Sequence, residues 1–383
     1  REDALDEYGG SKETEAAVLA ALRWLKRTQK DDGSWGEYEG RECNHPVPFS
    51  SFALLAFLAH GETPTESDEF GTTVRKAMQY LRDHMMGKDK VKKRDQCYIN
   101  GIETYALAEA YGMTKFPFLK APARKGLKMI INGQQKRGGW NYGYKASNVP
   151  EWDDEAEGDV RWDLSVSVWQ IQALKAGYVA DIKIPGIGRA IKKSITFCQD
   201  VAYKDGGFGY SSPGWDGRWG MQGAGILALQ LLGEKNCREV RKGLQKVKEG
   251  MPFEWKRPDE TGEDESPATP EKWPVYTWYY LTQAMFHGGR STWNDWNNIY
   301  PETVVERQKS DGHWEMPVRE DRKNWGRDPW YATSLIALTL QVYYRYLPTY
   351  EMPEKLAIKD EEKDSSSLDV DSSDTEGLDI DVQ

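Results

Sequence analysis

The sequence predicts an all-α protein, an (α/α)6 toroid in which six helical hairpins close into a ring, followed by a disordered acidic C-terminal tail. Three observations support this prediction. Apolar segments recur at a nearly constant interval, charged amphipathic segments alternate with them, and a short turn motif follows three of the charged segments. A repeat of roughly this length is typical of folds built from stacked supersecondary units.

The apolar segments are expected to form the inner helices of the ring. They begin at Ser50, Thr104, Ser165, Gly223, Thr277 and Thr333, so successive starts differ by 54, 61, 58, 54 and 56 residues. Each segment is apolar on nearly every face, which indicates a helix that is buried on all sides. A glycine follows five of them and predicts a C-terminal cap at each. These glycines are Gly61, Gly112, Gly177, Gly233 and Gly288.

The amphipathic segments are expected to form the outer helices, over 13–29, 72–86, 121–133, 188–199, 237–249 and 293–308. The segments that lead from each outer helix to the next inner helix are long, at 30–49, 87–103, 134–163, 200–221, 250–275 and 309–330. If the inner helices are parallel, these loops all gather at the ring end that holds the inner-helix N-termini. Loops of this length in a compact domain are usually functional, so we expect the site there.

Three outer helices end in the same motif, QxxxGxW, at Gln29–Trp35, Gln134–Trp140 and Gln308–Trp314. A diverged copy follows Gln199 and ends in Gly206-Gly-Phe208. The motif predicts a structural clamp, in which Gln caps the outer helix, Gly makes the turn and Trp lies back over the helix end. We expect these Trp side chains to pack and not to catalyse.

Repeated QxxxGxW motifs between helical hairpins resemble the squalene–hopene cyclase and prenyltransferase repeat superfamily, over about residues 10–350. Gly138-Gly-Trp140, Asp163-LSVSVWQIQALK and Tyr343-YRYLP further resemble small, single-toroid, squalene-cyclase-like proteins of bacteria, a branch without an assigned reaction. This resemblance implies a toroid whose aromatic-lined central cavity binds an apolar, isoprenoid-like ligand.

Class II terpene cyclases, to which the resemblance extends, carry a DxDD motif before an inner helix. The matching stretch here is Asp159-Val-Arg-Trp-Asp163, in which only Asp163 stands where the motif needs an acid. Protonation of an alkene needs an unusually strong acid, so the interrupted motif argues against cyclisation. Asp163 also fits the N-cap position of the third inner helix. The candidate acids are Asp163 and the consecutive pair Asp153 and Asp154.

The long-loop end is rich in aromatic residues, which can stabilise cations, stack on sugars or pack the loops. Three functions remain open at this stage. The first is binding of an isoprenoid-like ligand, the second is a polysaccharide lyase or hydrolase that uses paired carboxylates, and the third is a non-catalytic interaction module with an acidic tether. The candidate ligand-binding residues are Tyr144, Trp152, Trp162, Trp219, Tyr276 and Trp330.

The formal net charge of −10 is concentrated in the tail. Residues 360–383 hold ten acids and one base, a net charge of −9, which leaves 50 − 51 = −1 for residues 1–359. Without clustered basic residues we expect no nucleic-acid partner. We place the toroid at residues 1–351 and a disordered tail at 352–383. The tail repeats Leu368-Asp-Val-Asp and Leu378-Asp-Ile-Asp, and it either docks on a protein partner or only aids solubility.

The four cysteines are far apart in the sequence and form no CxxC pair, which argues against a zinc ribbon or a dithiol redox site. Buried free thiols are favoured over long-range disulfides. The only closely spaced Cys and His are Cys43 and His45, so we expect no metal and no cofactor. No window reaches the ~18 apolar residues of a membrane span, and the first residues do not resemble a signal peptide. The sequence assigns no compartment.

Overall fold

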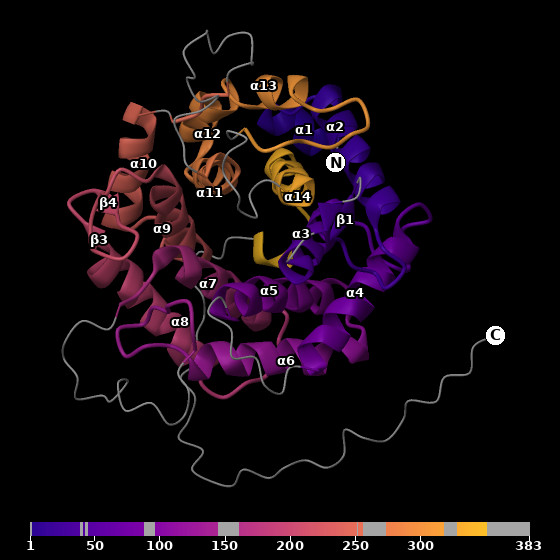
Figure 1. Ribbon diagram of the computed structural model, residues 1–383. Helices are drawn as coiled ribbons and strands as arrows, with labels where there is room; N and C mark the ends of the chain where they lie inside the picture. Colours follow the sequence, from indigo (N-terminus) through magenta and orange to yellow (C-terminus); the bar gives the residue numbers. More distant parts are fainter. Residues whose placement is uncertain are drawn as a thin grey trace, which may run out of the picture.

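The computed structural model describes residues 2–38, 41–42, 45–87, 96–144, 161–250, 252–255, 273–317 and 328–350. Together these residues form the predicted α/α toroid, in which inner helices are surrounded by outer ones (Figure 1). The inner helices are α3 (Pro46–Ala59), α5 (Gln96–Thr114), α7 (Leu164–Val179), α9 (Trp219–Leu231), α11 (Pro274–His287) and α14 (Pro329–Leu340).

The outer helices are α2 (Lys12–Thr28), α4 (Gly71–Met86), α6 (Pro117–Asn132), α8 (Ile187–Thr196), α10 (Arg238–Gly250), α12 (Arg290–Asn297) and α13 (Pro301–Glu306). Helix α1 (Glu2–Tyr8) precedes the ring, and a π-helical turn, η2 (Phe197–Ala202), extends α8. Two short antiparallel ribbons lie in long loops: β1 (Glu37–Tyr38) pairs with β2 (Arg41–Glu42), and β3 (Tyr203–Lys204) pairs with β4 (Gly207–Phe208).

Burial separates the two kinds of helix as the sequence predicts. In α3, every residue from Val47 to Ala59 is buried, because neighbours surround this helix on all sides. In α2, the buried residues fall on one face, with Val18, Leu22 and Leu25 among them, and the opposite face carries the charged residues. An outer helix therefore turns its apolar stripe toward the inner layer and its charged face toward solvent.

The ring is closed, so an open solenoid is excluded. The last inner helix, α14, packs against α3 and α2 at the beginning of the ring, and α13 packs against α2. Hydrogen bonds also join the two ends of the ring: Gln308 Nε2 donates to the Ala17 carbonyl at 2.8 Å, and Arg27 donates to the Asp311 carbonyl at 2.6 Å.

The three QxxxGxW copies make the same hydrogen bonds. In the first, Trp35 Nε1 donates to the Leu25 carbonyl in the last turn of its own outer helix, at 2.7 Å. Gln29 Nε2 donates to the Gly33 carbonyl of the turn at 3.0 Å and to the Thr73 carbonyl of the next outer helix at 2.9 Å. Tryptophan thus satisfies the helix end, whereas glutamine, expected to cap that end, joins the turn to the neighbouring hairpin.

The diverged copy is also joined to a neighbouring helix, but by a different glutamine. Here the backbone N–H of Phe208 donates to Gln222 Oε1 at 3.1 Å, and Gln222 Nε2 donates to the carbonyls of Gly206 and Gly243, both at 3.2 Å. The bridging glutamine therefore comes from the inner helix α9, and it joins this turn to α10.

Two local expectations were wrong. The outer helix expected over 293–308 is two helices, α12 and α13, because Pro301 cannot continue a helix that arrives from the preceding turn. Glycine ends α3 and α9, where Gly61 and Gly233 adopt φ of 90° and 89°. However, α7 continues past Gly177 to Val179. A Cβ added at Gly177 would lie 2.4 Å from the Leu127 side chain, so glycine is needed there for packing and not for a cap. That glycine allows close packing of two helices.

Helix α5 also departs from the glycine expectation. Helix α5 continues past Gly112 to Thr114, and Lys115, at φ 55°, supplies the left-handed residue. Helix α11, by contrast, ends as expected: Gly288 is its C-cap, at a right-handed φ of −73°, and Gly289 follows in a left-handed conformation at φ 95°.

The segment after α14 crosses the ring end where the inner helices finish. Gln341 Nε2 donates to the Ala56 carbonyl at 2.9 Å, and the Tyr346 N–H donates to the Ala59 carbonyl at 3.0 Å. The 3-10 turn η5 (Pro348–Tyr350) then packs on α5 and α7 inside the ring (Figure 1). The Tyr343-YRYLP motif therefore covers the end of the ring opposite the long loops.

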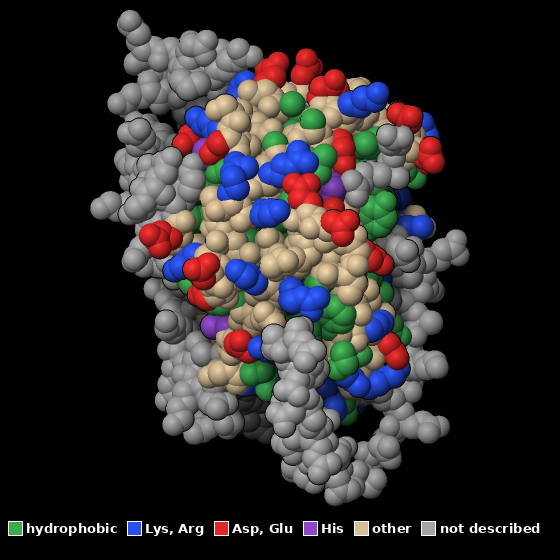
Figure 2. Space-filling model, turned by 90° about the vertical axis from the view of Figure 1, so that its right-hand side faces the viewer, with side chains coloured by type: hydrophobic (Ala, Val, Ile, Leu, Met, Phe, Trp, Pro, Cys, Tyr) green, Lys and Arg blue, Asp and Glu red, His purple; other side chains and the backbone are tan. Residues whose placement is uncertain are grey.

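On the side formed by α2 and α4, acidic and basic side chains are interspersed and neither sign forms a large patch (Figure 2). Among the described residues, no helix combines the length and the apolar character that a membrane span needs. The predicted tail, 352–383, lies outside the described residues.

Candidate functional site

The long-loop end of the ring brings one carboxyl group and five tyrosines together. Three of the tyrosines lie in the first turn of an inner helix, Tyr98 in α5, Tyr276 in α11 and Tyr331 in α14. Asp163 lies directly before α7. Because the inner helices are parallel, all these positions lie at the same end of the ring, where the inner helices begin. With Tyr142 and Tyr210 from the loops, we call this set the mouth cluster.

Asp163 is fully buried and confirms the N-cap prediction. Its Oδ1 accepts hydrogen bonds from the Ser165 N–H at 2.9 Å, the Ser165 hydroxyl at 2.6 Å and the Val166 N–H at 3.2 Å. Its Oδ2 is buried and has no hydrogen-bond partner among the described residues. Burial raises the pKa of this carboxyl, although the donors on Oδ1 and the Tyr210 hydroxyl oppose the shift.

The loop tyrosines are held against Asp163 by the backbone. The N–H of Leu164 donates to the Tyr210 carbonyl at 2.8 Å, and the hydroxyls of Tyr210 and Tyr142 are 2.8 Å apart. Burial, and then the neighbouring Asp163 carboxyl, raise the pKa of Tyr210. The ring of Tyr142 stacks on that of Tyr98 at a centroid distance of 6.3 Å.

The tyrosines of the inner helices face the same space. Burial raises the pKa of both Tyr98 and Tyr276 well above the ordinary value, and Tyr331 and Asp163 add to each shift. Tyr276 Oη is buried without a hydrogen-bond partner among the described residues. Tyr98 keeps some accessible surface although burial dominates its pKa.

Below the mouth cluster, aromatic rings meet across the axis of the ring. Trp169 of α7 lies 5.3 Å from Phe52 of α3, and 5.7 and 5.5 Å from Tyr279 and Tyr280 of α11. These three helices are every second inner helix of the ring, so Trp169 joins three separate parts of its wall. We call these four residues the aromatic floor. Trp169 Nε1 is buried without a hydrogen-bond partner in the described part of the chain.

Of the predicted ligand-binding residues, Tyr276 belongs to the mouth cluster and three others pack elsewhere. Trp162 packs edge-on against Phe197 at 5.3 Å, on the side of α8. Trp330 is fully buried and stacks on Phe49 at 6.3 Å. Tyr144 donates to Gln170 Oε1 at 2.7 Å, between α5 and α7.

Trp219 is partly exposed and packs against Trp215 at 4.5 Å, near the end of α10. Trp152, Asp153 and Asp154 lie outside the described residues.

Sequence reasoning missed Tyr98 and Tyr331 because the inner helices are apolar all round, and periodicity then does not show which face turns toward the axis. In addition, the second inner helix was expected to begin at Thr104, which placed Tyr98 in a loop. In the structure this helix, α5, already begins at Gln96. A signal was present: Tyr276 and Tyr331 hold equivalent first-turn positions, two residues after Pro274 and Pro329.

A second polar cluster lies at the closed end of the ring. Arg345 donates to Gln283 Oε1 and to the Leu338 carbonyl, and its guanidinium lies over the Tyr350 ring at 4.9 Å. Burial raises the pKa of Glu109 to about 8, against the opposing effects of the Thr349 N–H and of Arg345. This cluster is separated from the mouth cluster by the aromatic floor and anchors the C-terminal segment.

Within the described ranges, no group of three or more His, Cys, Asp or Glu side chains is arranged to hold a metal ion. Cys97 and Cys198 are buried free thiols and Cys237 is a half-buried one, whereas Cys43 lies outside the described residues. Burial raises the pKa of all three described thiols, which disfavours the reactive thiolate.

No family model matches the chain, and a sequence search of curated proteins finds no match. Solved α/α toroids are similar in fold. The GH76 alpha-1,6-mannanase from Salegentibacter sp. HEL1_6 has a TM-score of 0.60 at 13% identity, over 86% of this chain and 98% of that chain. A GH76 alpha-mannanase from Bacteroides thetaiotaomicron has a TM-score of 0.58 at 12% identity, over 90% and 98%.

The type II terpene cyclase MstE from Scytonema is also similar, with a TM-score of 0.53 at 12% identity over 86% of this chain and 98% of that chain. Glycosidases and terpene cyclases thus share this architecture, and at such identities the likeness shows the fold alone. The chemistry has to be argued from the mouth cluster.

Proposed function

We propose that the mouth cluster binds a carbohydrate and that Asp163 acts on it as a general acid. The observation that carries the proposal is the asymmetry of the Asp163 carboxyl. Oδ1 is fixed by three donors, whereas Oδ2 is buried beside the Tyr210 hydroxyl and forms no hydrogen bond of normal geometry with the described residues. A proton on Oδ2 leaves the helix cap intact and is available to a substrate oxygen.

The polar atoms of the site favour a ligand rich in hydroxyl groups. Asp163 Oδ2, Tyr276 Oη and Trp169 Nε1 are all buried and form no hydrogen bond of normal geometry in the described part of the chain. Their nearest polar neighbours are the hydroxyls of Tyr210, Tyr280 and Tyr98. Burial of such atoms costs free energy unless they form hydrogen bonds, and a hydrocarbon supplies none. A sugar supplies hydroxyl donors and acceptors, and its ring stacks on aromatic faces such as those of Tyr98 and Tyr331.

The acid strength of Asp163 also favours a carbohydrate substrate over an alkene. A carboxyl whose pKa is raised stays protonated closer to neutral pH, which suits proton transfer to a glycosidic oxygen. Protonation of an alkene needs a stronger acid, not a weaker one. A hydrolase also needs a second carboxylate as nucleophile or base, and we assign that role to Asp153 or Asp154. An inactive variant of the Salegentibacter mannanase has two consecutive aspartates replaced by asparagine.

The test measures binding and hydrolysis of linear oligosaccharides, with α-1,6-mannotriose among them, by calorimetry and by release of reducing ends. The Asp163→Asn variant should bind within about twofold of the parent, since Asn is an equally good N-cap, but should lose at least about 100-fold in rate. Tyr276→Phe keeps the ring and should weaken binding instead. The Ser165→Ala control removes one donor from Oδ1 and should shift the pH profile without abolishing the rate.

Activity should need protonated Asp163. The rate should therefore fall as the pH rises through the raised pKa of its carboxyl, and Ser165→Ala should move this fall to higher pH because a hydrogen bond to the carboxylate is lost. An unchanged rate in Asp163→Asn, or no binding of any oligosaccharide, contradicts the proposal.

A second candidate, binding of an isoprenoid-like ligand, is favoured by the aromatic floor, since Phe52 and Trp169 present apolar faces to the same space. The same calorimetry with a C20 prenyl alcohol separates the two. Binding of the alcohol, unaffected by Tyr276→Phe and without oligosaccharide binding, favours this candidate over the first.

A further inference from the structure

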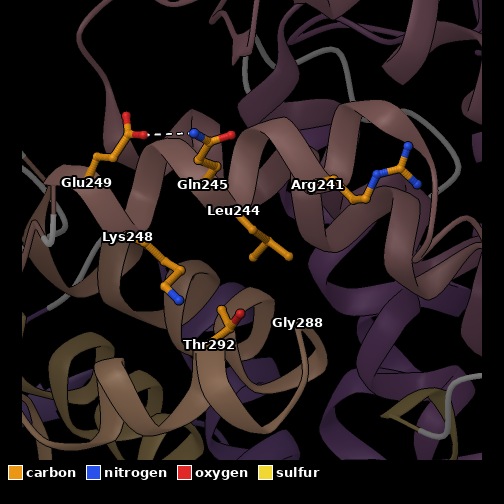
Figure 3. Close-up of a pocket in the computed structure, with 7 residues that line it drawn as sticks. All are labelled: Arg241, Leu244, Gln245, Lys248, Glu249, Gly288 and Thr292. Atoms are coloured by element: carbon orange, nitrogen blue, oxygen red, sulfur yellow. Dashed lines mark hydrogen bonds between the residues drawn. The ribbon is translucent and has the colours of Figure 1, made fainter.

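A shallow groove of about 500 Å³ lies on the outside of the ring, between α10 and the start of α12 (Figure 3). Helix α10 lines it with Arg241, Leu244, Gln245, Lys248 and Glu249. Gly288, directly after α11, and Thr292 of α12 line the other side. Figure 3 shows Leu244 and Lys248 projecting toward α12, where Thr292 faces them. None of these residues belongs to the mouth cluster.

The groove combines an apolar floor, formed by the mostly buried Leu244, with a rim that carries two basic side chains and the acidic Glu249. Leu244 packs closely under Gly288, where an added Cβ would lie 3.0 Å from a leucine methyl. Helix α10 carries five basic and two acidic residues, a net charge of 5 − 2 = +3. On the rim, Lys248 pairs with Asp295 at 2.8 Å and is still 37% exposed, and Arg241 is exposed. An acidic segment with spaced apolar side chains would complement this surface.

The chain itself contains such a segment. The 33 residues after Tyr350 include the stretch 360–383, whose net charge is −9. Within it, Leu368-Asp-Val-Asp and Leu378-Asp-Ile-Asp alternate apolar and acidic side chains. In an extended chain, alternate side chains point to opposite sides, so the apolar pair can face a floor while the carboxylates stay within reach of long basic side chains.

The described chain ends inside the ring, near the end of α11 that leads into the groove. The ring of Tyr350 lies 4.5 Å from that of His287, and His287 directly precedes the groove residue Gly288. Eighteen residues separate Tyr350 from Leu368 (368 − 350), which spans up to ~60 Å when extended, at about 3.3 Å per residue. A tethered segment also acts at an effective concentration near the millimolar range, so a weak motif suffices.

We propose that the acidic tail docks in this groove of its own chain, with the apolar residues of one Leu-Asp-x-Asp copy over Leu244 and its carboxylates against Arg241 and Lys248. The occupant follows from charge complementarity and from the point at which the described chain ends. The docked tail would cover the face formed by α10 and α12 and leave the mouth cluster open.

The test places photoreactive benzoylphenylalanine at Val370, or separately at Ile380, in the full chain and maps the cross-linked peptides by mass spectrometry. We expect intramolecular cross-links to α10 or α12 from at least one position. The Arg241→Glu/Lys248→Glu double variant should lower their yield at least about fivefold, and 0.5 M salt should also lower it, because exposed ion pairs are screened. The control Lys242→Glu, an exposed residue of α10 that does not line the groove, should keep most of the yield.

Three results overturn the proposal. The first is cross-linking only to other surfaces. The second is cross-linking between chains when isotope-labelled and unlabelled protein are mixed, which makes a second copy the occupant. The third is a yield that is equal in the double variant and in Lys242→Glu. Because no step depends on the mouth cluster, this outcome is independent of the carbohydrate proposal.

Discussion

Replacing Gln308 tests whether the QxxxGxW motif holds the ring closed. Gln308 Nε2 donates to the Gly312 carbonyl at 2.9 Å and to the Ala17 carbonyl of the first outer helix at 2.8 Å. Gln308→Ala removes both bonds, each with a net contribution of about 1 kcal/mol. Gln308 is half-buried, so water partly replaces the lost donor. We therefore expect a loss of about 1–2 kcal/mol in the free energy of unfolding.

The measurement is the midpoint of thermal unfolding, which should fall by about 1–3 °C in Gln308→Ala. Gln308→Glu keeps the size but turns a carboxylate toward two carbonyl oxygens, so its loss should be at least as large. Gln29→Ala, which breaks the equivalent bonds at the first hairpin, should match Gln308→Ala. The control Gln79→Ala, at an exposed position of α4, should change stability by less than about 0.5 kcal/mol. If Gln308→Ala behaves like Gln79→Ala, the clamp argument is wrong.

Two further predictions concern stability. Gly138 adopts φ 91°, and an added Cβ would lie 2.1 Å from the Lys193 carbonyl oxygen, so Gly138→Ala should cost at least about 3 kcal/mol. Gly206 has φ 87° with nothing within 4 Å of an added Cβ, so Gly206→Ala should cost only about 1 kcal/mol, and equal losses in unfolding scans would refute the contact argument. The pKa of Glu109 rises from 4.5 to about 8 on folding, so its stabilising effect is complete below about pH 4.5 and is lost as the pH rises through 8. Glu109→Gln, which stays neutral, should therefore lose less unfolding midpoint between pH 6 and 9 than the parent; parallel pH curves would contradict this.

The sequence indicates where in the fold the candidate site lies, but it does not show which side chains form it. The alternation of long and short connections placed the site at the N-terminal end of the inner helices, and Asp163 was recognised as an N-cap and as a candidate acid. Trp162 and Trp330 were chosen for their place in the long loops, yet both pack into the body. Tyr98 and Tyr331 could not be chosen, because an inner helix that is apolar on every side does not show which residues face the axis.

By itself, the sequence determined the six hairpins and their division into inner and outer helices. The spacing of the hairpins, the all-round apolar inner helices and the repeated QxxxGxW turns are local patterns, and local patterns specify helices and their connections. Only the tertiary structure decided that Trp169 meets Phe52 across the axis and that Oδ2 of Asp163 is buried among tyrosines. Those relations join residues from different hairpins, such as Trp169 and Phe52, which are 117 positions apart (169 − 52), and they depend on how each helix is rotated in the ring. That rotation is set by packing volumes such as the missing side chain of Gly177.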